Sequence, residues 1–258
     1  MRCLLPVVLL CLVEGALGDE LSLRVVEGRP VVDGVFVNGA GPYRFLVDTG
    51  ATMNHLEAGL ARKAGLRPTF RTELTSSLGM VAVPGNDGLS VVVGETRADE
   101  QPFLFAGMDA VHGLSTDIQG ILGQAFLSRF DYTIDLRGRR LAFGKREAAG
   151  KRAVFQILGG RALVATSLGD LILDSGTGQL VLFGEAGTSG GQSYMRTLTG
   201  SGLVGLIQSR LAIGGRSVWT GQAVALPKRE EPGVAGLLPI RLFRSVYVCN
   251  CEGYLVFQ

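Results

Sequence analysis

The stretch FLVDTGATMN (Phe45–Asn54) and a second stretch, LILDSGTGQL (Leu171–Leu180), follow one pattern. In each, an apolar run ends on an aspartate, which is followed by Thr or Ser and then by Gly. Apolar runs bounded by turn residues predict buried strands, so we expect Asp48 and Asp174 at two strand ends. A single copy is an ordinary turn sequence, but two copies at matching places indicate a repeated design.

The sequence on both sides of these stretches repeats as well. Residues 31–50 (VVDGVFVNGAGPYRFLVDTG) and residues 161–176 (RALVATSLGDLILDSG) each predict a hairpin that leads into the aspartate. Residues 120–143 and 236–257 both begin with Gly and an apolar pair. Each then continues with a short helical turn, a strand, a polar turn and a final strand. The sequence therefore predicts two lobes, residues 19–146 and 153–258, joined by a charged linker within Gly144–Ala153.

Each half also contains a glycine-rich hairpin candidate after its aspartate. The first spans Thr72–Gly85 and the second spans Arg196–Gly215. Glycine at a tip permits a positive φ and a close approach to a ligand, so both hairpins are candidates for substrate binding. The candidate binding residues at the two tips are Ser77, Leu78 and Gly79, and Thr199, Gly200 and Ser201. Residues 54–66 (NHLEAGLARKAGL) predict a helix from the spacing of their apolar side chains.

Composition supports a mainly β protein. The 258 residues are 47% hydrophobic and 19% charged, and they include 38 Gly without a strict period but only 9 Pro. This profile is typical of a globular chain with many tight turns. The net charge is +2 and no long basic run occurs, so nucleic acid is not an expected partner.

Residues 1–18 read as a secretory signal peptide. Arg2 precedes a short apolar stretch, and small residues follow at 16–18, where a signal peptidase cuts. We therefore expect export, with the mature protein secreted or periplasmic and without a stable membrane span. Cleavage would remove Cys3 and Cys11.

The remaining cysteines, Cys249 and Cys251, would project from one face of a strand. A bridge between them would be strained, so two half-buried thiols are expected. Neither His55 nor His112 has a metal-ligand spacing, and no cofactor or metal site is predicted.

The paired motifs suit acid-base chemistry. If an approximate two-fold axis relates the halves, Asp48 and Asp174 meet on that axis and share one proton. The ionised carboxylate can take a proton from water while the protonated one polarises a carbonyl. Thr49 and Ser175 would bond to the opposite half, and Gly50 and Gly176 would leave room for the facing loop. These residues, with Ala51 and Thr177 next in sequence, form the predicted support of the dyad.

With these motifs the chain resembles the aspartic proteases, and more narrowly bacterial retropepsin-like proteins with two D-[ST]-G halves in one chain. The resemblance implies a bilobal, mainly β fold with pseudo-two-fold symmetry. It also implies a protein that hydrolyses the peptide bonds of an extended polypeptide. It also implies that the hairpins are flaps, that residues 120–123 and 236–239 pack beneath the aspartate loops, and that the chain is a monomer with an internal pseudo-dimer. Two features depart from the pattern: Pro239 stands where Gly is usual, and the first flap lacks Tyr.

Other functions fit less well. A non-catalytic peptide-binding module on the same scaffold is the main alternative, although both carboxylates are present. A serine hydrolase would need a G-x-S-x-G elbow, which is missing, and the stretch at 187–193 lacks the lysine of a phosphate loop. A hydroxyl at Thr177 that bonds to Asp174 would lower its pKa, whereas Ala51 offers none, so we expect a mildly acidic optimum.

Overall fold

The computed structural model describes residues 19–76, 78–146, 148–184, 190–227 and 233–258. The predicted signal peptide and Ser77 lie outside this part of the chain. Within it, strands dominate: β1 (Glu20–Val26), β2 (Arg29–Val37), β3 (Ala40–Val47), β4 (Asn54–Glu57), β5 (Phe70–Ser76), β6 (Gly79–Val93), β7 (Thr96–Ala106), β8 (Gly120–Leu122), β9 (Tyr132–Asp135), β10 (Arg140–Phe143), β11 (Lys151–Leu158), β12 (Arg161–Thr166), β13 (Gly169–Asp174), β14 (Val181–Phe183), β15 (Gln192–Thr197), β16 (Gly200–Ile213), β17 (Arg216–Leu226), β18 (Gly236–Pro239), β19 (Ser245–Cys249) and β20 (Tyr254–Phe257). The helices are short: α1 (Ala58–Lys63), α2 (Asp109–His112), α3 (Gln124–Leu127) and the 3-10 turn η1 (Ile240–Leu242).

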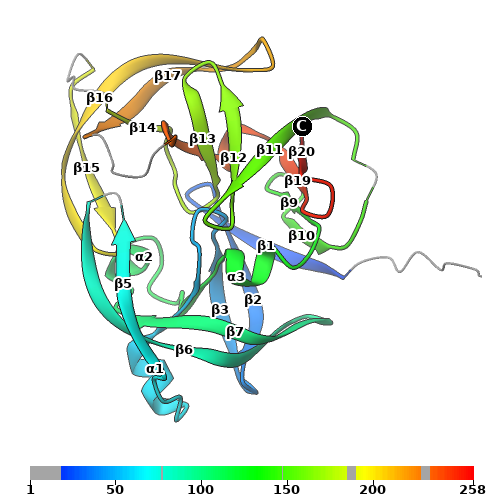
Figure 1. The fold of residues 1–258 in the computed structure, drawn as a ribbon, viewed down its shortest axis with the longest axis vertical. Coiled ribbons are helices and arrows are strands. Elements are labelled where there is room, and N and C mark those ends of the chain that lie inside the picture. Colours follow the sequence, from blue (N-terminus) through cyan, green and yellow to red (C-terminus); the bar gives the residue numbers. More distant parts are fainter. Residues whose placement is uncertain (1–18, 77, 147, 185–189, 228–232) are drawn as a thin grey trace, which may run out of the picture.

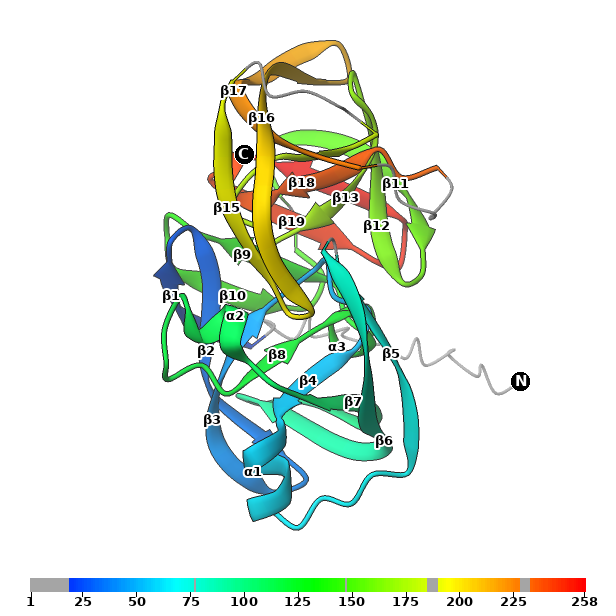
Figure 2. The same ribbon diagram turned by 90° about the vertical axis from the view of Figure 1, so that its left-hand side faces the viewer.

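The strand pairings repeat between the two halves. Strands β1 to β3 form a meander, and β11 to β13 form its counterpart. In the first half β8 runs parallel to β3 and antiparallel to β4, and in the second half β18 has the same relation to β13 and β14. Each half therefore builds a sheet of its own, and Figure 2 shows them as an upper and a lower lobe. The mainly β, bilobal fold expected from the sequence is confirmed.

A third sheet joins the lobes. Its strand order is β1–β10–β9–β19–β20–β11, and every neighbouring pair is antiparallel. The central pair comes from different halves, with Val246 opposite Ile134 and Val248 opposite Tyr132. The last three residues of the predicted linker, 151–153, belong to β11 and pair with β20.

The largest hydrophobic core runs through both lobes and beneath the shared sheet. It includes an aromatic cluster in which Phe126 and Phe130 pack at 5.1 Å and both contact Phe143 edge-on. Figure 1 shows α3, which carries Phe126, close to the point where the two lobes meet. Gln124, the first residue of α3, donates its side-chain N–H to the carbonyl of Thr49 at 2.9 Å, which connects this part of the core to the first aspartate loop.

The helix predicted over residues 54–66 was wrong in its first turn. Residues Asn54–Glu57 form β4, which lies between β7 and β8, and the helix covers only Ala58–Lys63. Leu56 is fully buried in the sheet. Pairing on both edges therefore outweighed the helical spacing of the apolar residues, which is a tertiary effect that local pattern does not contain.

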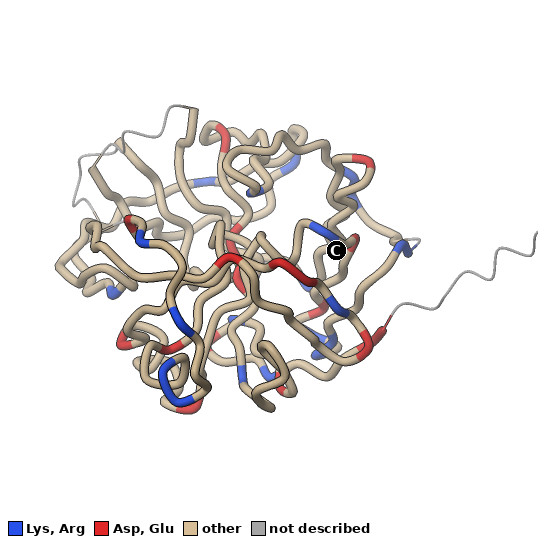
Figure 3. The backbone as a smooth tube through the Cα atoms, turned by 60° about the horizontal axis from the view of Figure 1, so that its bottom comes forward, with Lys and Arg blue, Asp and Glu red and all other residues tan. Residues whose placement is uncertain are grey.

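Charged residues are spread around the surface. Figure 3 shows Lys and Arg interspersed with Asp and Glu over both lobes. Among the described residues, helices are too short and too polar to cross a membrane.

Candidate active site

The two aspartates lie at equivalent strand ends. Asp48 directly follows β3, and its backbone N–H donates to the carbonyl of Leu122 at 2.9 Å. Asp174 is the last residue of β13 and stands opposite Pro239 of β18. In both halves the parallel apolar strand, β8 or β18, lies beside the aspartate-bearing strand, as the sequence predicted for residues 120–123 and 236–239.

Thr49 and Ser175 link the two loops through four buried hydrogen bonds. The Thr49 hydroxyl donates to the carbonyl of Leu173 (2.8 Å), and the Ser175 hydroxyl donates to that of Val47 (2.6 Å). Each hydroxyl oxygen also accepts the backbone N–H of the opposite residue: Thr49 N–H to Ser175 Oγ is 2.9 Å, and Ser175 N–H to Thr49 Oγ1 is 3.0 Å. Since each side chain uses a donor and an acceptor across the lobe boundary, the two loops are held in one relative position.

The glycines face the opposite carboxylates. A Cβ added to Gly50 would lie 2.5 Å from Cγ of Asp174, and one added to Gly176 would lie 2.5 Å from Cγ of Asp48. Neither distance allows a methyl group without movement. The carboxyl groups of Asp48 and Asp174 are themselves in hydrogen-bonding contact. The arrangement therefore brings two acids from different lobes to one point.

Backbone N–H groups hold both carboxylates. The N–H of Gly50 donates to Asp48 Oδ1 (2.9 Å), and the N–H of Thr177 donates to Asp174 Oδ1 (2.8 Å). The hydroxyl of Thr177 was expected to bond to Asp174, and this was wrong. It donates to the carbonyl of Gln179 at 3.2 Å, because the loop turns it away from the carboxylate. The backbone of Ala51 supplies an N–H to Asp48, so the two halves stabilise their carboxylates in the same way.

Burial raises the pKa of both aspartates above the ordinary value. For Asp174, which is 8% exposed, the negative charge of Asp48 raises the pKa further. The N–H donors act in the opposite direction. Two carboxyl groups in contact cannot both be ionised without strong repulsion, so the pair retains one proton well above the pH at which a free aspartate loses its own.

Arg29 is a cation beside the pair, and no pattern in the sequence pointed to it. Its Nε donates to the carbonyl of Gly176 (2.8 Å), and its side chain is 18% exposed. Burial lowers the pKa of its guanidinium, while the charges of Glu27, Asp174 and Asp48 raise it. Arg29 stands at the start of β2, so a residue of the first lobe fixes the loop of the second. Only the tertiary pairing reveals this contact.

The departure at Pro239 has a local explanation. In the first half the N–H of Gly123 donates to Asn54 Oδ1 at 3.0 Å, and both groups are buried. In the second half Pro239 has no N–H, and Leu180, 2% exposed, occupies the position that matches Asn54. Donor and acceptor are thus replaced together by an apolar pair, which leaves no buried polar group unpaired.

The two hairpins meet over the aspartates. Ser76 Oγ donates to Thr197 Oγ1 at 2.7 Å and also contacts the hydroxyl of Thr199. In Figure 2 the tip of β15–β16 extends from the upper lobe toward the tip of β5. Leu78 and Gly79 of the first tip line a cleft of about 1430 Å³ that also contains Asp48 and Asp174.

The second tip differs from the prediction. The hairpin consists of β15 and β16, with Thr197 paired to Gly200, so the turn lies at residues 198–199 and not near residues 199–202, where the sequence predicted it. As a result, Thr199 and Gly200 face the first hairpin: a Cβ on Gly79 would lie 3.3 Å from the carbonyl of Thr199. The cleft is instead lined by residues 193–198, and Thr199, Gly200 and Ser201 do not line it.

Comparisons with known proteins agree with this architecture. Residues 34–129 match the family model of the gag-polyprotein putative aspartyl protease. A solved structure, the aspartic proteinase from Irpex lacteus, is similar over 93% of this chain and 96% of that chain, with a TM-score of 0.54 and 13% identity. The chain has the aspartic protease fold.

A retropepsin-like aspartic protease from Rickettsia conorii shares 24% identity with 48% of this chain, covering 88% of that structure with a TM-score of 0.37. No curated protein matches the sequence. The predicted resemblance to retropepsin-like and pepsin-like aspartic proteases is confirmed by the family match and the fold.

Proposed function

We propose that the chain is an aspartic endopeptidase in which Asp48 and Asp174 activate one water molecule. The ionised carboxylate accepts a proton from that water, and the protonated carboxyl group donates a hydrogen bond to the scissile carbonyl. The resulting hydroxide equivalent attacks the carbonyl carbon, and the amide nitrogen leaves after it is protonated. No covalent enzyme intermediate forms.

The observation that carries the proposal is the contact between two carboxyl groups supplied by opposite lobes. A single buried aspartate could be structural, but an acid pair of raised pKa in an open cleft is suited to general acid-base work. Thr49 and Ser175 brace the pair, while Gly50 and Gly176 give the facing carboxylates room. Ala51 and Thr177 contribute their backbone N–H groups.

The substrate we propose is a polypeptide in an extended conformation. The cleft runs beneath two hairpins, and both hairpins supply side chains to its walls. An extended chain presents its side chains alternately to the two sides, which suits a groove bounded by both lobes. We further propose that the chain works as a monomer, because both aspartates come from one polypeptide, and that residues 1–18 direct its export.

The test is cleavage of a peptide library across a range of pH by the wild-type protein and by Asp48→Asn and Asp174→Asn. Each substitution should abolish cleavage, because it removes either the base or the acid and leaves the shape intact. Asp99→Asn is the matched control: Asp99 is exposed in β7, and within the described part of the chain its carboxylate pairs with Arg97 alone, so activity should persist. Peptide binding without cleavage by the wild-type protein would instead identify a binding module.

A further inference from the structure

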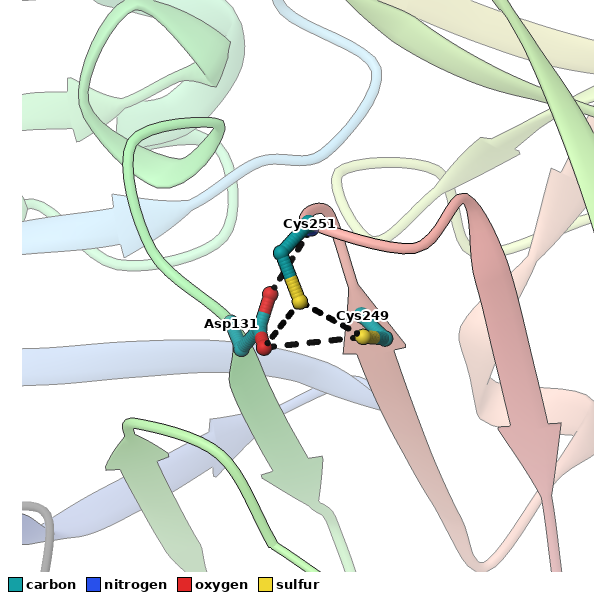
Figure 4. Close-up of side chains that lie close together, drawn as sticks. All are labelled: Asp131, Cys249 and Cys251. Carbon is teal, nitrogen blue, oxygen red and sulfur yellow. Dashed lines mark hydrogen bonds between the residues drawn. The ribbon is translucent and has the colours of Figure 1, made fainter. Parts of the chain in front are cut away.

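A second group of side chains lies away from the aspartates, at one end of the two central strands of the sheet that joins the lobes. Among the described residues, Asp131, Cys249 and Cys251 bring one carboxylate oxygen and two sulfurs within 4.8 Å of one another. The sulfurs are 3.2 Å apart, and Asp131 Oδ2 lies 3.5 Å from Cys249 Sγ and 3.1 Å from Cys251 Sγ. Figure 4 shows all three side chains pointing toward a common centre.

The sequence alone predicted two half-buried thiols and no metal site, whereas the structure buries Cys249, exposes Cys251 and places Asp131 beside both. Asp131 precedes β9 in the first half, whereas Cys249 ends β19 and Cys251 lies in the turn that follows. The antiparallel pairing of β9 with β19 brings these segments together. A ligand set that spans 120 residues of sequence cannot be recognised from local spacing.

The donor triangle is close to the size that a tetrahedral cation requires. With metal–sulfur distances of about 2.3 Å and metal–oxygen distances of about 2.0–2.2 Å, neighbouring sulfurs lie about 3.8 Å apart and sulfur and oxygen about 3.5 Å. The observed sulfur–sulfur distance of 3.2 Å would have to grow by about 0.6 Å, and the sulfur–oxygen distances of 3.1 and 3.5 Å by about 0.4 Å or less. Cys251 is exposed, so its side chain has the freedom to move outward, while the buried Cys249 holds the inner corner.

We propose that Asp131, Cys249 and Cys251 bind one thiophilic divalent cation of the zinc class, with water as the fourth ligand. Thiolate sulfurs favour such soft ions, and a single carboxylate completes a three-ligand set that leaves one position open. Binding displaces the two thiol protons to solvent, and the two sulfurs and the carboxylate oxygen donate to the metal. Lys145, which pairs with Glu252 at 2.8 Å, also interacts electrostatically with both cysteines.

Such a site would act as a link between the lobes. Asp131 belongs to the first half and both cysteines belong to the second, so one cation would connect β9 to the β19–β20 turn. A ligand that binds only the folded chain raises its stability by mass action. We therefore expect the cation to raise the melting temperature. We also expect peptide cleavage, which we place in the cleft that contains Asp48 and Asp174, to need no added metal.

The experiment uses the full-length chain, reduced and stripped of metal with a chelator. Titration with Cd²⁺ should give ultraviolet thiolate-to-metal absorption that saturates at one ion per chain, and competition against a chromophoric chelator should report Zn²⁺ binding. Cys251→Ser and Asp131→Asn should each weaken binding at least tenfold and remove the rise in melting temperature. The asparagine retains the oxygen that accepts the backbone N–H of Cys251 (3.1 Å), so it tests the charge and not the turn.

The matched control replaces the other two cysteines, Cys3 and Cys11, with serine and should bind the ion as the wild-type protein does. Circular dichroism of the metal-free variants verifies that each one is folded. The proposal is overturned if the reduced wild-type chain gives no saturable absorption. It is equally overturned if binding survives both Cys251→Ser and Asp131→Asn, or if the Cys3 and Cys11 control loses it.

Discussion

Gly50→Ala offers a sharp test of the geometry around the aspartates. The new Cβ would lie 2.5 Å from Cγ of Asp174, and ordinary contact begins near 3.4 Å, so the carboxylate must retreat by 0.9 Å. A misplacement of about 1 Å in a reacting group can lower a rate about 100-fold, which corresponds to about 2.7 kcal/mol in the barrier. The backbone N–H that Gly50 donates to Asp48 is kept. We therefore expect kcat to fall about 100-fold while the fold persists.

The assay compares kcat and KM for one peptide substrate, with Gly107→Ala as the matched control. Gly107 is exposed, and a Cβ there would meet no atom within 4 Å, so the control should keep wild-type rates. Urea unfolding of both variants separates a local effect from a loss of stability. If Gly50→Ala stayed within twofold of the wild-type protein, the contact between the loop of one lobe and the carboxylate of the other would not govern catalysis.

Three further predictions concern the brace, the nearby cation and a buried histidine. Thr49→Val leaves the carbonyl of Leu173 and the N–H of Ser175 without their partner, so the free energy of unfolding in urea should fall by about 1–3 kcal/mol for each lost hydrogen bond. An unchanged free energy of unfolding would contradict a stabilising role for the hydrogen bonds of Thr49. Arg29→Met removes a positive charge that lowers the pKa of the aspartate pair, so both limbs of the pH–rate profile should move to higher pH, and Arg29→Lys should restore much of the shift. Burial lowers the pKa of His55 to about 4, so the folded state binds fewer protons than the unfolded state between about pH 6.5 and 4. Stability should therefore be complete above that window and decline by about 3 kcal/mol as the pH falls through it, and His55→Leu should reduce this decline in urea titrations.

The sequence predicted those features that rest on local pattern and repetition. Asp48 and Asp174 stood out because the same tripeptide follows an apolar strand in both halves. Thr49 and Ser175 followed from the chemistry of a hydroxyl at a two-fold axis, and the structure contains hydrogen bonds of that kind. The hairpin that leads into each aspartate also followed, since its turn has its own sequence signal.

The features that the sequence did not predict depend on contacts between distant segments. Asn54–Glu57 is a strand because β7 and β8 pair with it, and its spacing alone indicates a helix. Arg29 meets Gly176 only after the lobes assemble, and Asp131 meets Cys251 only through the shared sheet. The direction of the Thr177 hydroxyl could not be predicted either, because it depends on the turn that places the carbonyl of Gln179 beside it.

The register of the two hairpins could not be predicted for the same reason. Their existence followed from glycine-rich turns, but their register depends on which side chains meet across the cleft. The hydroxyl cluster of Ser76, Thr197 and Thr199 joins the two tips, and its members come from opposite lobes. No local signal distinguishes a turn at 198–199 from one at 199–202, and a shift of two residues changes which side chains enter the cleft.

The shared proton can be followed by NMR of ¹³C-labelled carboxyl groups across pH, which reports the protonation of each aspartate. Asp48 and Asp174 should titrate in two coupled steps and hold one proton between them at a pH well above about 3.9, the ordinary value for aspartate. In Asp174→Asn the remaining Asp48 should titrate in a single step, because no second carboxylate lies beside it. Two independent titrations near the ordinary value in the wild-type chain would contradict the shared proton and, with it, the proposed activation of water.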